Sequence, residues 1–408
     1  MINIVENQIG RGNIFKINEG VFLVEGAQRA AIYDTTKGNV YSLNQEARDI
    51  VLEQRRDVGF YEELGKLGLV SFDNDITKFE LETPSLGLEF IWLELTSKCN
   101  LTCLHCYAES SPKIDQEELP TKIWEKVIEE GAKIGCRQLQ FIGGEPLIFE
   151  QIFDLAACAK SFGYQFIEIF TNGTLLNADK VKRIKDLGLR VAVSLYSNDP
   201  VIHDLVTGSS GSFNKTMSAL RLLKEAEVPI RIGVVIMNQN QATVGNTLEM
   251  IQKMGFDGGE SADVVRTIGR GKKQNLLPDP EVCRNFGTMI QPVFVTDKNS
   301  FERNCIGNPC WLGKIAVTAT GDIIPCVAGR QHIVGNVAEE LEEAVEGNPL
   351  QKLWRISKDK IKVCSGCEYR YACGDCRPLA EAETGNLYSK TPRCDYDPFT
   401  GEWKKGGE

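Results

Sequence analysis

The sequence predicts an α/β fold built around a parallel sheet of six strands. Strand-like and helix-like segments alternate from residue 90 to about residue 269. The strand segments VAVSLY (191–196) and IGVVIM (232–237) are almost continuously apolar, as expected for parallel strands buried on both faces. After residue 282 this alternation stops, and the remaining chain holds nine of the fourteen cysteines. We therefore expect a separate cysteine-rich domain after the sheet.

Composition narrows the class of protein. At 408 residues, with 42% hydrophobic and 25% charged residues, the chain is long enough for several globular domains. No apolar run reaches the ~18 residues of a membrane span, and the start MINIVENQIGRGN does not resemble a secretory signal. The net charge of −10 argues against a nucleic-acid partner. We expect a cytoplasmic protein, in which fourteen cysteines point to metal ligation rather than disulfides.

The first 85 residues are predicted to form a small α+β module. Residues 14–26 and 30–44 alternate like strands, with a turn at 35–39, and residues 45–54 read as a helix. Another short helix ends at Gly68, and residues 73–87 have the composition of a linker. We place the boundary near residue 85.

Residues 86–282 are predicted to form the sheet domain. Five helices separate six strands, which implies parallel βαβ units. Six units support a partial (β/α)6 barrel of the TIM type rather than the full eightfold barrel. The expected strands are 90–97, 138–143, 166–173, 190–196, 230–238 and 262–269, and the expected helices are 121–135, 149–162, 178–188, 213–226 and 243–255.

Three cysteines follow the first strand of this domain in the stretch CNLTCLHCY. Cys99, Cys103 and Cys106 lie directly beyond that strand, where parallel α/β folds build their active sites. Three thiolates can bind three corners of an iron–sulfur cluster and leave one iron open to a ligand, and zinc with an open site is the competing metal. The spacing therefore predicts a metal site.

The same stretch resembles the Cys-x3-Cys-x2-Cys motif of the radical S-adenosylmethionine (SAM) superfamily, and the βα pattern over roughly residues 90–270 resembles the partial barrel of that family. The resemblance implies that these cysteines hold a [4Fe–4S] cluster that binds SAM. His105 occupies the position at which the family packs a side chain near the adenine. By the same resemblance Tyr107, which follows the third cysteine, is expected to contact the cofactor.

Further SAM contacts follow from the resemblance. GGEP at 143–146 resembles the glycine-rich turn that binds the methionine amino group. Gly143 and Gly144 permit close backbone approach, and Glu145 can accept a hydrogen bond from an ammonium. By the same resemblance, Asn172 and Ser194 at the next strand ends face the ribose or carboxylate of the cofactor.

Eight cysteines in the region 283–408 are enough to ligate two further four-iron clusters, although two structural zinc sites are also compatible with the Cys-x2-Cys pairs. Their spacing resembles the SPASM extension of peptide-modifying radical enzymes. The resemblance implies one auxiliary cluster on Cys305, Cys310, Cys326 and Cys376, and a second on Cys364, Cys367, Cys373 and Cys394. The unspaced Cys136, Cys158 and Cys283 are interpreted as structural thiols.

The N-terminal module, mainly through YSLNQEA (41–47), resembles the winged-helix domain that recognises leader peptides in maturation systems for ribosomally made peptides. An exposed strand edge in such a module can accept an extended peptide as an added strand. A remote contact of this kind orients a long substrate.

These features predict a radical SAM oxidoreductase that abstracts hydrogen from a precursor peptide and forms a thioether or carbon–carbon cross-link. The implied cofactors are SAM and three [4Fe–4S] clusters, and the implied partners are the precursor with its leader and an electron donor such as flavodoxin or ferredoxin. The sequence has only three histidines and no apparent Ser-His-Asp arrangement, which agrees with a reaction carried out by a cofactor. No catalytic side chain is predicted. Two alternatives stay open: a side-chain-oxidising maturase of the anaerobic sulfatase-maturase type, and a non-catalytic iron–sulfur scaffold or peptide-binding partner.

Overall fold

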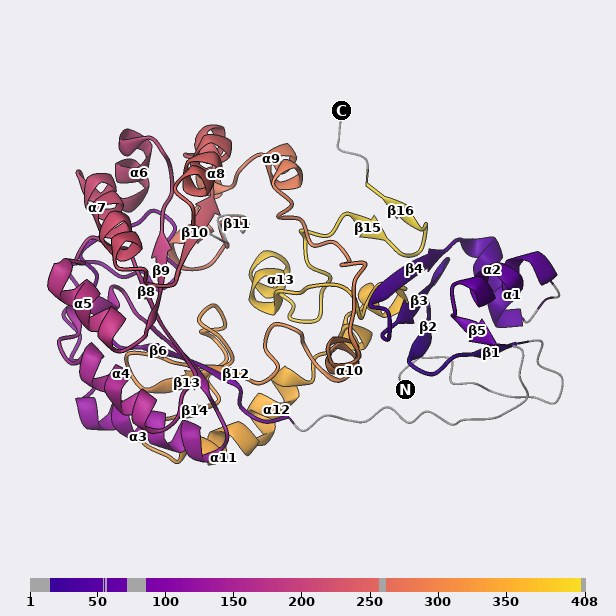
Figure 1. Ribbon diagram of the computed structural model, residues 1–408, viewed down its shortest axis with the longest axis horizontal. Helices are drawn as coiled ribbons and strands as arrows, with labels where there is room; N and C mark the ends of the chain where they lie inside the picture. Colours follow the sequence, from indigo (N-terminus) through magenta and orange to yellow (C-terminus); the bar gives the residue numbers. More distant parts are fainter. Residues whose placement is uncertain (1–14, 54, 56, 72–85, 257–261, 405–408) are drawn as a thin grey trace. The chain divides into compact units, whose positions relative to one another are not determined.

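The computed structural model describes residues 15–53, 55, 57–71, 86–256 and 262–404 (Figure 1). The chain divides into two compact units, each assembled from separate parts of the sequence. One contains residues 1–85, 289–312 and 353–408, and the other contains residues 86–288 and 313–352. We call them the N/C unit and the sheet unit.

The sheet unit is organised around nine strands in the order β11-β10-β9-β8-β7-β6-β12-β13-β14. The strands β6 to β11 are parallel and adjacent in chain order, β12 pairs parallel with β6, and β13 and β14 are antiparallel additions. Their bounds are β6 Phe90–Glu94, β7 Gln138–Ile142, β8 Phe166–Thr171, β9 Arg190–Ser194, β10 Ile230–Ile236, β11 Ala262–Val264, β12 Lys314–Val317, β13 Asp322–Ile324 and β14 Gly335–Asn336.

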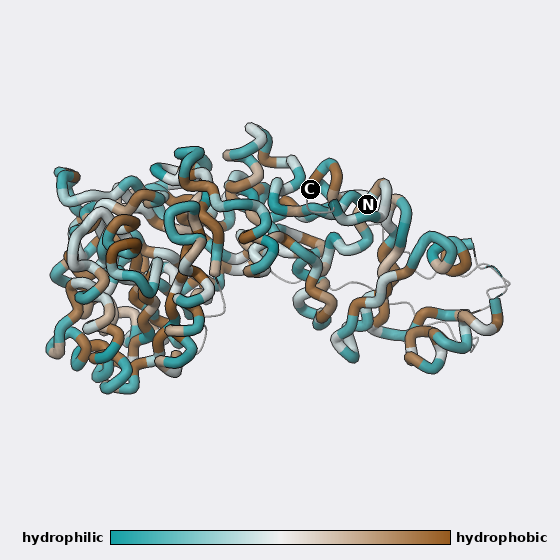
Figure 2. The backbone as a smooth tube through the Cα atoms, turned by 90° about the horizontal axis from the view of Figure 1, so that it is seen from above, coloured by the Kyte–Doolittle hydropathy of each residue, from teal (hydrophilic) through white to brown (hydrophobic). Residues whose placement is uncertain are grey.

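Helices α3 to α8 flank these strands in Figure 1. The helices of this unit are α3 Thr121–Lys133, α4 Ile152–Ser161, α5 Ala178–Asp186, α6 Pro200–Thr207, α7 Ser212–Glu225, α8 Val244–Lys253, α9 Pro280–Asn285 and α11 Leu341–Glu346. In α3 the buried Trp124, Val127 and Ile128 recur at helical spacing, which gives the helix one apolar face. In Figure 2, hydrophobic and hydrophilic residues alternate along the backbone tube, as expected for helices with one apolar face.

The N/C unit contains a three-stranded antiparallel sheet in the order β2-β3-β4. Its strands are β2 Val21–Glu25, β3 Ala30–Asp34 and β4 Asn39–Leu43, and β1 Lys16–Ile17 pairs separately with β5 Val70–Ser71. The other elements are α1 Gln45–Glu53, α2 Val58–Lys66, α10 Lys298–Ile306, α13 Arg377–Thr384, β15 Tyr396–Asp397 and β16 Glu402–Trp403, while α12, Asn348–Trp354, crosses the boundary of the two units.

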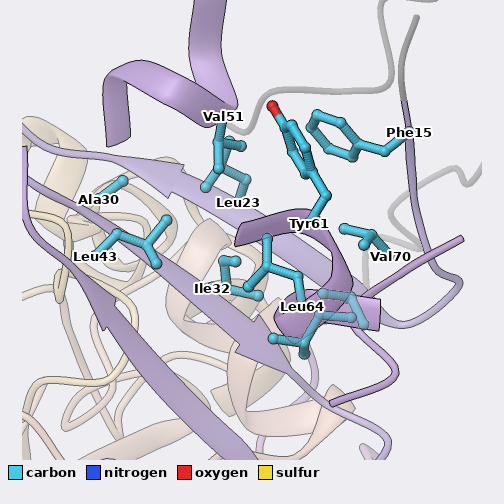
Figure 3. Close-up of a cluster of buried hydrophobic side chains, with 11 residues drawn as sticks. Phe15, Leu23, Ala30, Ile32, Leu43, Val51, Tyr61, Leu64 and Val70 are labelled. Carbon is cyan, nitrogen blue, oxygen red and sulfur yellow. The ribbon is translucent and has the colours of Figure 1, made fainter. Parts of the chain in front are cut away.

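One face of the three-stranded sheet forms a local core with α1 and α2. Buried residues from the strands, among them Leu23 and Ile32, pack with Tyr61 and Leu64 of α2 (Figure 3). The Tyr61 ring stacks on Phe15 with centroids 4.4 Å apart, and its hydroxyl donates to the Ile50 carbonyl at 2.9 Å. Asp57 caps α2 by accepting from the Phe60 amide, an N-terminal signal that favours a helix here.

The opposite face of the same sheet packs on C-terminal residues of the N/C unit. Phe22 stacks on Phe301 with centroids 4.4 Å apart, and the hydroxyl of Tyr33 donates to the Glu368 carbonyl at 2.9 Å. The ligand candidate Cys305 belongs to this buried cluster. The N-terminal strands therefore share a core with the cysteine-rich segment.

The α/β class and the central parallel sheet predicted from the sequence are confirmed. The compact units, however, cut across the three-part division at residues 85 and 282. The cause is strand pairing: β12, from the cysteine-rich region, adds to the edge of the sheet at β6, with Ile315 beside Ile91 and Val317 beside Leu93. Most of the expected linker, 73–87, lies outside the described residues.

Within the described residues, no helix combines the length and apolar character needed to cross a membrane.

Candidate functional site

The three cysteines of CNLTCLHCY line one cavity in the sheet unit. The loop that carries them leaves the carboxyl end of β6, and the cavity measures about 280 Å³. Of the six predicted SAM-binding residues, five also line it: Tyr107, Gly143, Gly144, Asn172 and Ser194. The structure therefore brings together residues from the ends of four neighbouring strands.

The cysteine loop is held by backbone contacts on two sides. The amides of Thr102 and Leu104 donate to the carbonyls of Thr207 and Val206 at the end of α6, at 3.0 and 2.9 Å. On the other side, the guanidinium of Arg270 donates to the carbonyls of Cys103 and Ser110 at 2.8 and 2.9 Å. These contacts fix the conformation of the loop without using the thiols.

The turn at Gly143 and Gly144 lines the cavity and also contacts the backbone that leads into the cysteine loop. The amide of Gly144 donates to the Thr96 carbonyl at 2.8 Å, and the amide of Glu145 donates to the Lys98 carbonyl at 2.9 Å. Gly143 has a φ of +153°, and a Cβ on Gly144 would collide with the Lys98 carbonyl oxygen. Glycine is therefore needed here to let two backbone segments meet.

The carboxylate of Glu145 does not line the cavity. It is fully buried, and its oxygens accept hydrogen bonds from the hydroxyl of Thr171 at 2.6 Å and from the amide of Asn172 at 2.8 Å. Burial raises the pKa of Glu145, although these hydrogen bonds oppose the rise. In this structure Glu145 ties the GGEP turn to the end of β8, and its contact with the cofactor stays a prediction.

Asn172 connects that anchor to the first cysteine. Its side-chain nitrogen Nδ2 donates to the side-chain oxygen Oδ1 of Asn100 at 2.9 Å and lies 3.9 Å from the sulfur of Cys99. Its own side-chain oxygen Oδ1 accepts from the Thr174 hydroxyl at 2.6 Å. Asn172 is thus held in one orientation at the wall of the cavity.

The cavity has the features that a polar ligand and a metal cluster require. Two buried polar atoms in its wall, Nδ1 of His105 and Oγ of Ser110, have no hydrogen-bond partner among the described residues, and such groups are normally satisfied. Burial lowers the pKa of His105 to about 4, so its ring is neutral at neutral pH. Burial also raises the pKa of Cys99 to about 12, and iron binding deprotonates such thiols. The cavity therefore fits the predicted group.

A three-residue cluster around the buried Glu94, which sequence reasoning missed, lies beside the third cysteine. Glu94, the last residue of β6, forms an ion pair with Arg330 at 2.7 Å and a hydrogen bond with Tyr107. Burial raises the pKa of Glu94, and Arg330 opposes that rise. Because 236 positions separate Glu94 from Arg330, no local pattern could have indicated the pair.

Gly144→Ala should disrupt the cysteine loop. The added methyl group has no space beside the Lys98 carbonyl, so the loop must shift, and we expect the iron bound by these three cysteines to fall more than about tenfold, because ligand geometry controls metal affinity. Gly87→Ala is the matched control, since a Cβ there meets no atom within 4 Å. Iron content and the visible absorption of both reconstituted variants measure the effect, and equal cluster content would contradict the assigned role of Gly144.

A second cysteine-lined cavity lies in the N/C unit. Cys364, Cys367, Cys373 and Cys394 all line it, in a small space of about 20 Å³. These are the four cysteines that the SPASM resemblance groups together, and four thiols match the ligand number of a closed four-iron cluster.

Two buried cations share that cavity. Lys358 lies 3.8 Å from the Asp375 carboxylate, and Arg370 binds Asp359 at 2.9 Å. Burial lowers the pKa of Lys358, but Asp375 and the neighbouring Cys373 and Cys364 raise it above its ordinary value. A charged Lys358 offsets part of the negative charge that four thiolates would carry.

The remaining cysteines are distributed between the two units. Cys305, Cys310 and Cys376 belong to the N/C unit, and Cys326 belongs to the sheet unit. Cys136 and Cys283 are buried, Cys158 is half-buried, and none of the three lines either cavity.

All fourteen cysteines are described, and every one is a free thiol. Across the described ranges, no three His, Cys, Asp or Glu side chains converge on a single metal ion. A cluster does not need such convergence, because each cysteine binds a different iron.

Comparison with known proteins agrees with both cavities. Residues 93–251 match the family model described as the radical SAM superfamily, and residues 309–368 match the SPASM model, described as an iron–sulfur cluster-binding domain. The matched ranges contain the cysteine loop and four of the eight downstream cysteines. These matches imply SAM and more than one [4Fe–4S] cluster as cofactors.

Curated relatives align over most of the chain. An AdoMet-dependent heme synthase of Methanosarcina barkeri is 27% identical, covering 75% of this chain and 95% of the relative. A PqqA peptide cyclase of Granulibacter bethesdensis is 28% identical, covering 77% and 88%. The subtilosin biosynthesis protein AlbA of Bacillus subtilis is 27% identical, covering 74% and 70%.

A solved structure supports the fold. Streptococcus suis SuiB bound to the precursor peptide SuiA covers 93% of this chain and 99% of its own, with a TM-score of 0.63 and 16% identity. The family matches, the similar relatives and the cysteine-lined cavity at the strand ends lead to one assignment. The chain carries a radical SAM domain over residues 93–251 and a SPASM domain over residues 309–368.

Proposed function

We propose that this protein is a peptide maturase that forms an intramolecular thioether or carbon–carbon cross-link in a ribosomally made precursor. The observation that carries the proposal is the contrast between two cavities. One is lined by three cysteines and uncommitted polar groups, and the other by four cysteines and two buried cations. Relatives named as a peptide cyclase and a bacteriocin biosynthesis protein support a peptide substrate.

The proposed domains follow from this function. Residues 1–85 are a winged-helix-like leader-recognition module with its linker, residues 86–282 a six-stranded partial barrel, and residues 283–408 a SPASM domain. The shared core of Phe22, Tyr33 and Phe301 means that removing residues 1–85 would also expose part of the cysteine-rich segment. Point substitutions in the module are therefore the better test of its role.

In the first cavity, Cys99, Cys103 and Cys106 would hold a [4Fe–4S] cluster and SAM, which together supply a 5′-deoxyadenosyl radical when one electron is added. Asn172 and Ser194 are proposed to contact SAM from the wall of the cavity, at the ends of β8 and β9. Glu145 and Arg270 keep the surrounding loops in place. Tyr107, which is hydrogen-bonded to the buried Glu94, forms part of the cavity wall that would exclude water from the reaction.

The overall peptide change is an oxidation. One hydrogen atom leaves a peptide C–H bond to form 5′-deoxyadenosine, a thiol or second C–H group loses a proton, and one electron departs as the new bond forms. The peptide therefore loses two hydrogens. Cys364, Cys367, Cys373 and Cys394 are proposed to hold one auxiliary cluster for this electron, and Cys305, Cys310, Cys326 and Cys376 the other. The proposed electron donor is a flavodoxin or ferredoxin of the cytoplasm. The fourteen free thiols favour that compartment, because it keeps cysteines reduced.

The test uses precursor peptides encoded by short reading frames beside the gene. Anaerobically reconstituted protein, SAM and dithionite should convert the correct precursor into a product two hydrogens lighter, with the linkage located by tandem mass spectrometry. A product that reacts with hydrazides, and so carries an aldehyde, would favour the sulfatase-maturase alternative. Absence of 5′-deoxyadenosine with every precursor would favour the non-catalytic alternative.

A further inference from the structure

A buried ammonium group in the N/C unit is only loosely held. Lys358 begins the short 3-10 helix Lys358–Lys360, and 2% of the residue is exposed. The carboxylate of Asp375 lies 3.8 Å from its nitrogen, which is beyond hydrogen-bond distance. Within the described part of the chain, the Lys358 side chain donates no hydrogen bond. Because a buried charge without hydrogen bonds is costly, an acceptor for this ammonium is expected at the site.

Asp375 does not depend on Lys358 for its own partners. Its side chain is fully buried, the Arg377 guanidinium donates to it at 2.6 Å, and the side-chain amide of Asn308 donates to it at 2.9 Å. A carboxylate bonded by a buried guanidinium is already neutralised. The positive charge of Lys358 is therefore additional to what Asp375 needs.

Lys358 lines the cavity that four cysteines share in this unit. The charged residues in that lining, apart from the thiols, are all cations: Lys358, Arg370 and Lys390. Arg370 binds the Asp359 carboxylate at 2.9 Å, and the half-buried Lys390 donates to the Tyr396 carbonyl. Lys358 is thus the buried cation of this lining whose protons are not taken by another group of the described chain.

The charge of Lys358 reaches two of the cysteines. Burial raises the pKa of Cys373 to about 12, and Lys358 opposes that rise. Burial also raises the pKa of Cys364, and Lys358 opposes this rise as well. The ammonium therefore lies close enough to stabilise negative charge on the sulfur atoms of the cavity.

Negative charge is what a reduced cluster gains. Four thiolates and a four-iron cluster together carry a net negative charge, which increases by one when the cluster accepts an electron. A cation beside the sulfur atoms stabilises the reduced form more than the oxidised form, and hydrogen bonds to sulfur act in the same direction, so both raise the reduction potential.

We propose that Lys358 donates a hydrogen bond to a sulfur atom of the cluster bound by Cys364, Cys367, Cys373 and Cys394, and raises the reduction potential of that cluster. This inference rests on the proposed function, because it assigns a residue to the electron acceptor of that reaction. The electron released as the peptide cross-link forms reduces the cluster by one electron, and an oxidised flavodoxin or ferredoxin takes it away. Lys358 keeps its protons throughout.

A set of substitutions separates the charge from other effects. Lys358→Met removes the ammonium and leaves Asp375 bonded to Arg377 and Asn308. Lys358→Gln is a second neutral variant that can still donate a hydrogen bond, and Lys358→Arg keeps the charge. Lys360→Met is the matched control, because it removes the same charge from the same short helix at an exposed position, where solvent screens it.

A potentiometric titration followed by EPR measures the potential in the anaerobically reconstituted full-length proteins, and the signal that Cys373→Ala lacks identifies the cluster. Lys358→Met and Lys358→Gln should favour the oxidised form about tenfold more, a downward shift of about 59 mV for one electron. Lys358→Arg and Lys360→Met should match the unmodified protein. An unchanged potential in either neutral variant, or an equal shift in Lys360→Met, would overturn the inference.

Pulsed EPR of the unmodified protein checks the contact without a neutral variant. With ¹⁵N in the side chains of its lysines, the reduced cluster should show a coupling to a lysine nitrogen, and Lys358→Arg should lack that coupling. No lysine coupling in the unmodified protein would overturn the contact. Neither measurement needs SAM or a precursor peptide, so a shifted potential without cross-linked product would count against the proposed reaction alone.

Discussion

Replacing Cys99 with alanine should abolish reductive cleavage of SAM while leaving most of the iron in the protein. Cys99 shares its cavity with Cys103 and Cys106, and Asn172 lies 3.9 Å from its sulfur. Loss of a ligand should reduce 5′-deoxyadenosine formation by more than about 100-fold, because changing groups that only contact metal ligands already costs roughly 10- to 100-fold. Chromatography after dithionite reduction measures the nucleoside.

Iron content separates this loss from general damage. The unmodified protein should bind about twelve irons and Cys99→Ala about eight, four fewer for the missing cluster. Cys158→Ala is the control, since its half-buried thiol lies on α4 and lines neither cavity. Retained 5′-deoxyadenosine formation in Cys99→Ala, or about four irons in the unmodified protein, would contradict the assignment of one open cluster and two closed ones.

Replacing Cys373 with alanine should separate SAM cleavage from product formation. Cys373 lines the second cavity with three other cysteines, in a unit distinct from that of the first cavity. We expect cross-linked product to fall by more than about 100-fold, while 5′-deoxyadenosine is still formed because the first cavity is intact. Without an electron acceptor, the substrate cannot complete its oxidation.

The control for this variant comes from the same loop. Ser365→Ala lies between Cys364 and Cys367, is exposed, and leaves the number of thiols unchanged, so its product yield should equal that of the unmodified protein. Product mass and 5′-deoxyadenosine are measured in one reaction. Normal product yield from Cys373→Ala would exclude a catalytic need for the second cavity.

The sequence predicted the sheet well because each strand and helix carries its own local pattern. The strand 190–196 was expected from its apolar run, and β9 covers Arg190–Ser194. The position of the cysteine loop followed from the rule that active sites lie at the carboxyl ends of parallel strands. Local pattern and chain direction were sufficient for these features.

One helix was missed although its signals were present. In α6, Asp199 caps the first turn, Pro200 occupies the first helical position and Gly208 ends the helix in the left-handed region, a combination typical of helix boundaries. The buried His203 on this helix accepts from the Tyr196 amide at 3.3 Å. It is therefore a buried packing residue.

The contacts that sequence could not predict are those between distant segments. Pairing of β12 with β6 joins residues more than two hundred positions apart, and residues 292–296 hydrogen-bond to the edge of β4 from a similar separation in sequence. The local sequence pattern of neither segment predicts the strand with which it pairs. The role of Gly144 was partly predicted, since close approach was expected but the approaching group is the Lys98 carbonyl.

The most direct test of the central claim is the combined yield of 5′-deoxyadenosine and modified peptide from the unmodified protein with a precursor encoded beside its gene. Peptide oxidation by this chemistry predicts a product two hydrogens lighter, an internal cross-link in its fragmentation spectrum, and 5′-deoxyadenosine in at least equal amount. Formation of 5′-deoxyadenosine with the peptide mass unchanged for every neighbouring precursor would contradict it.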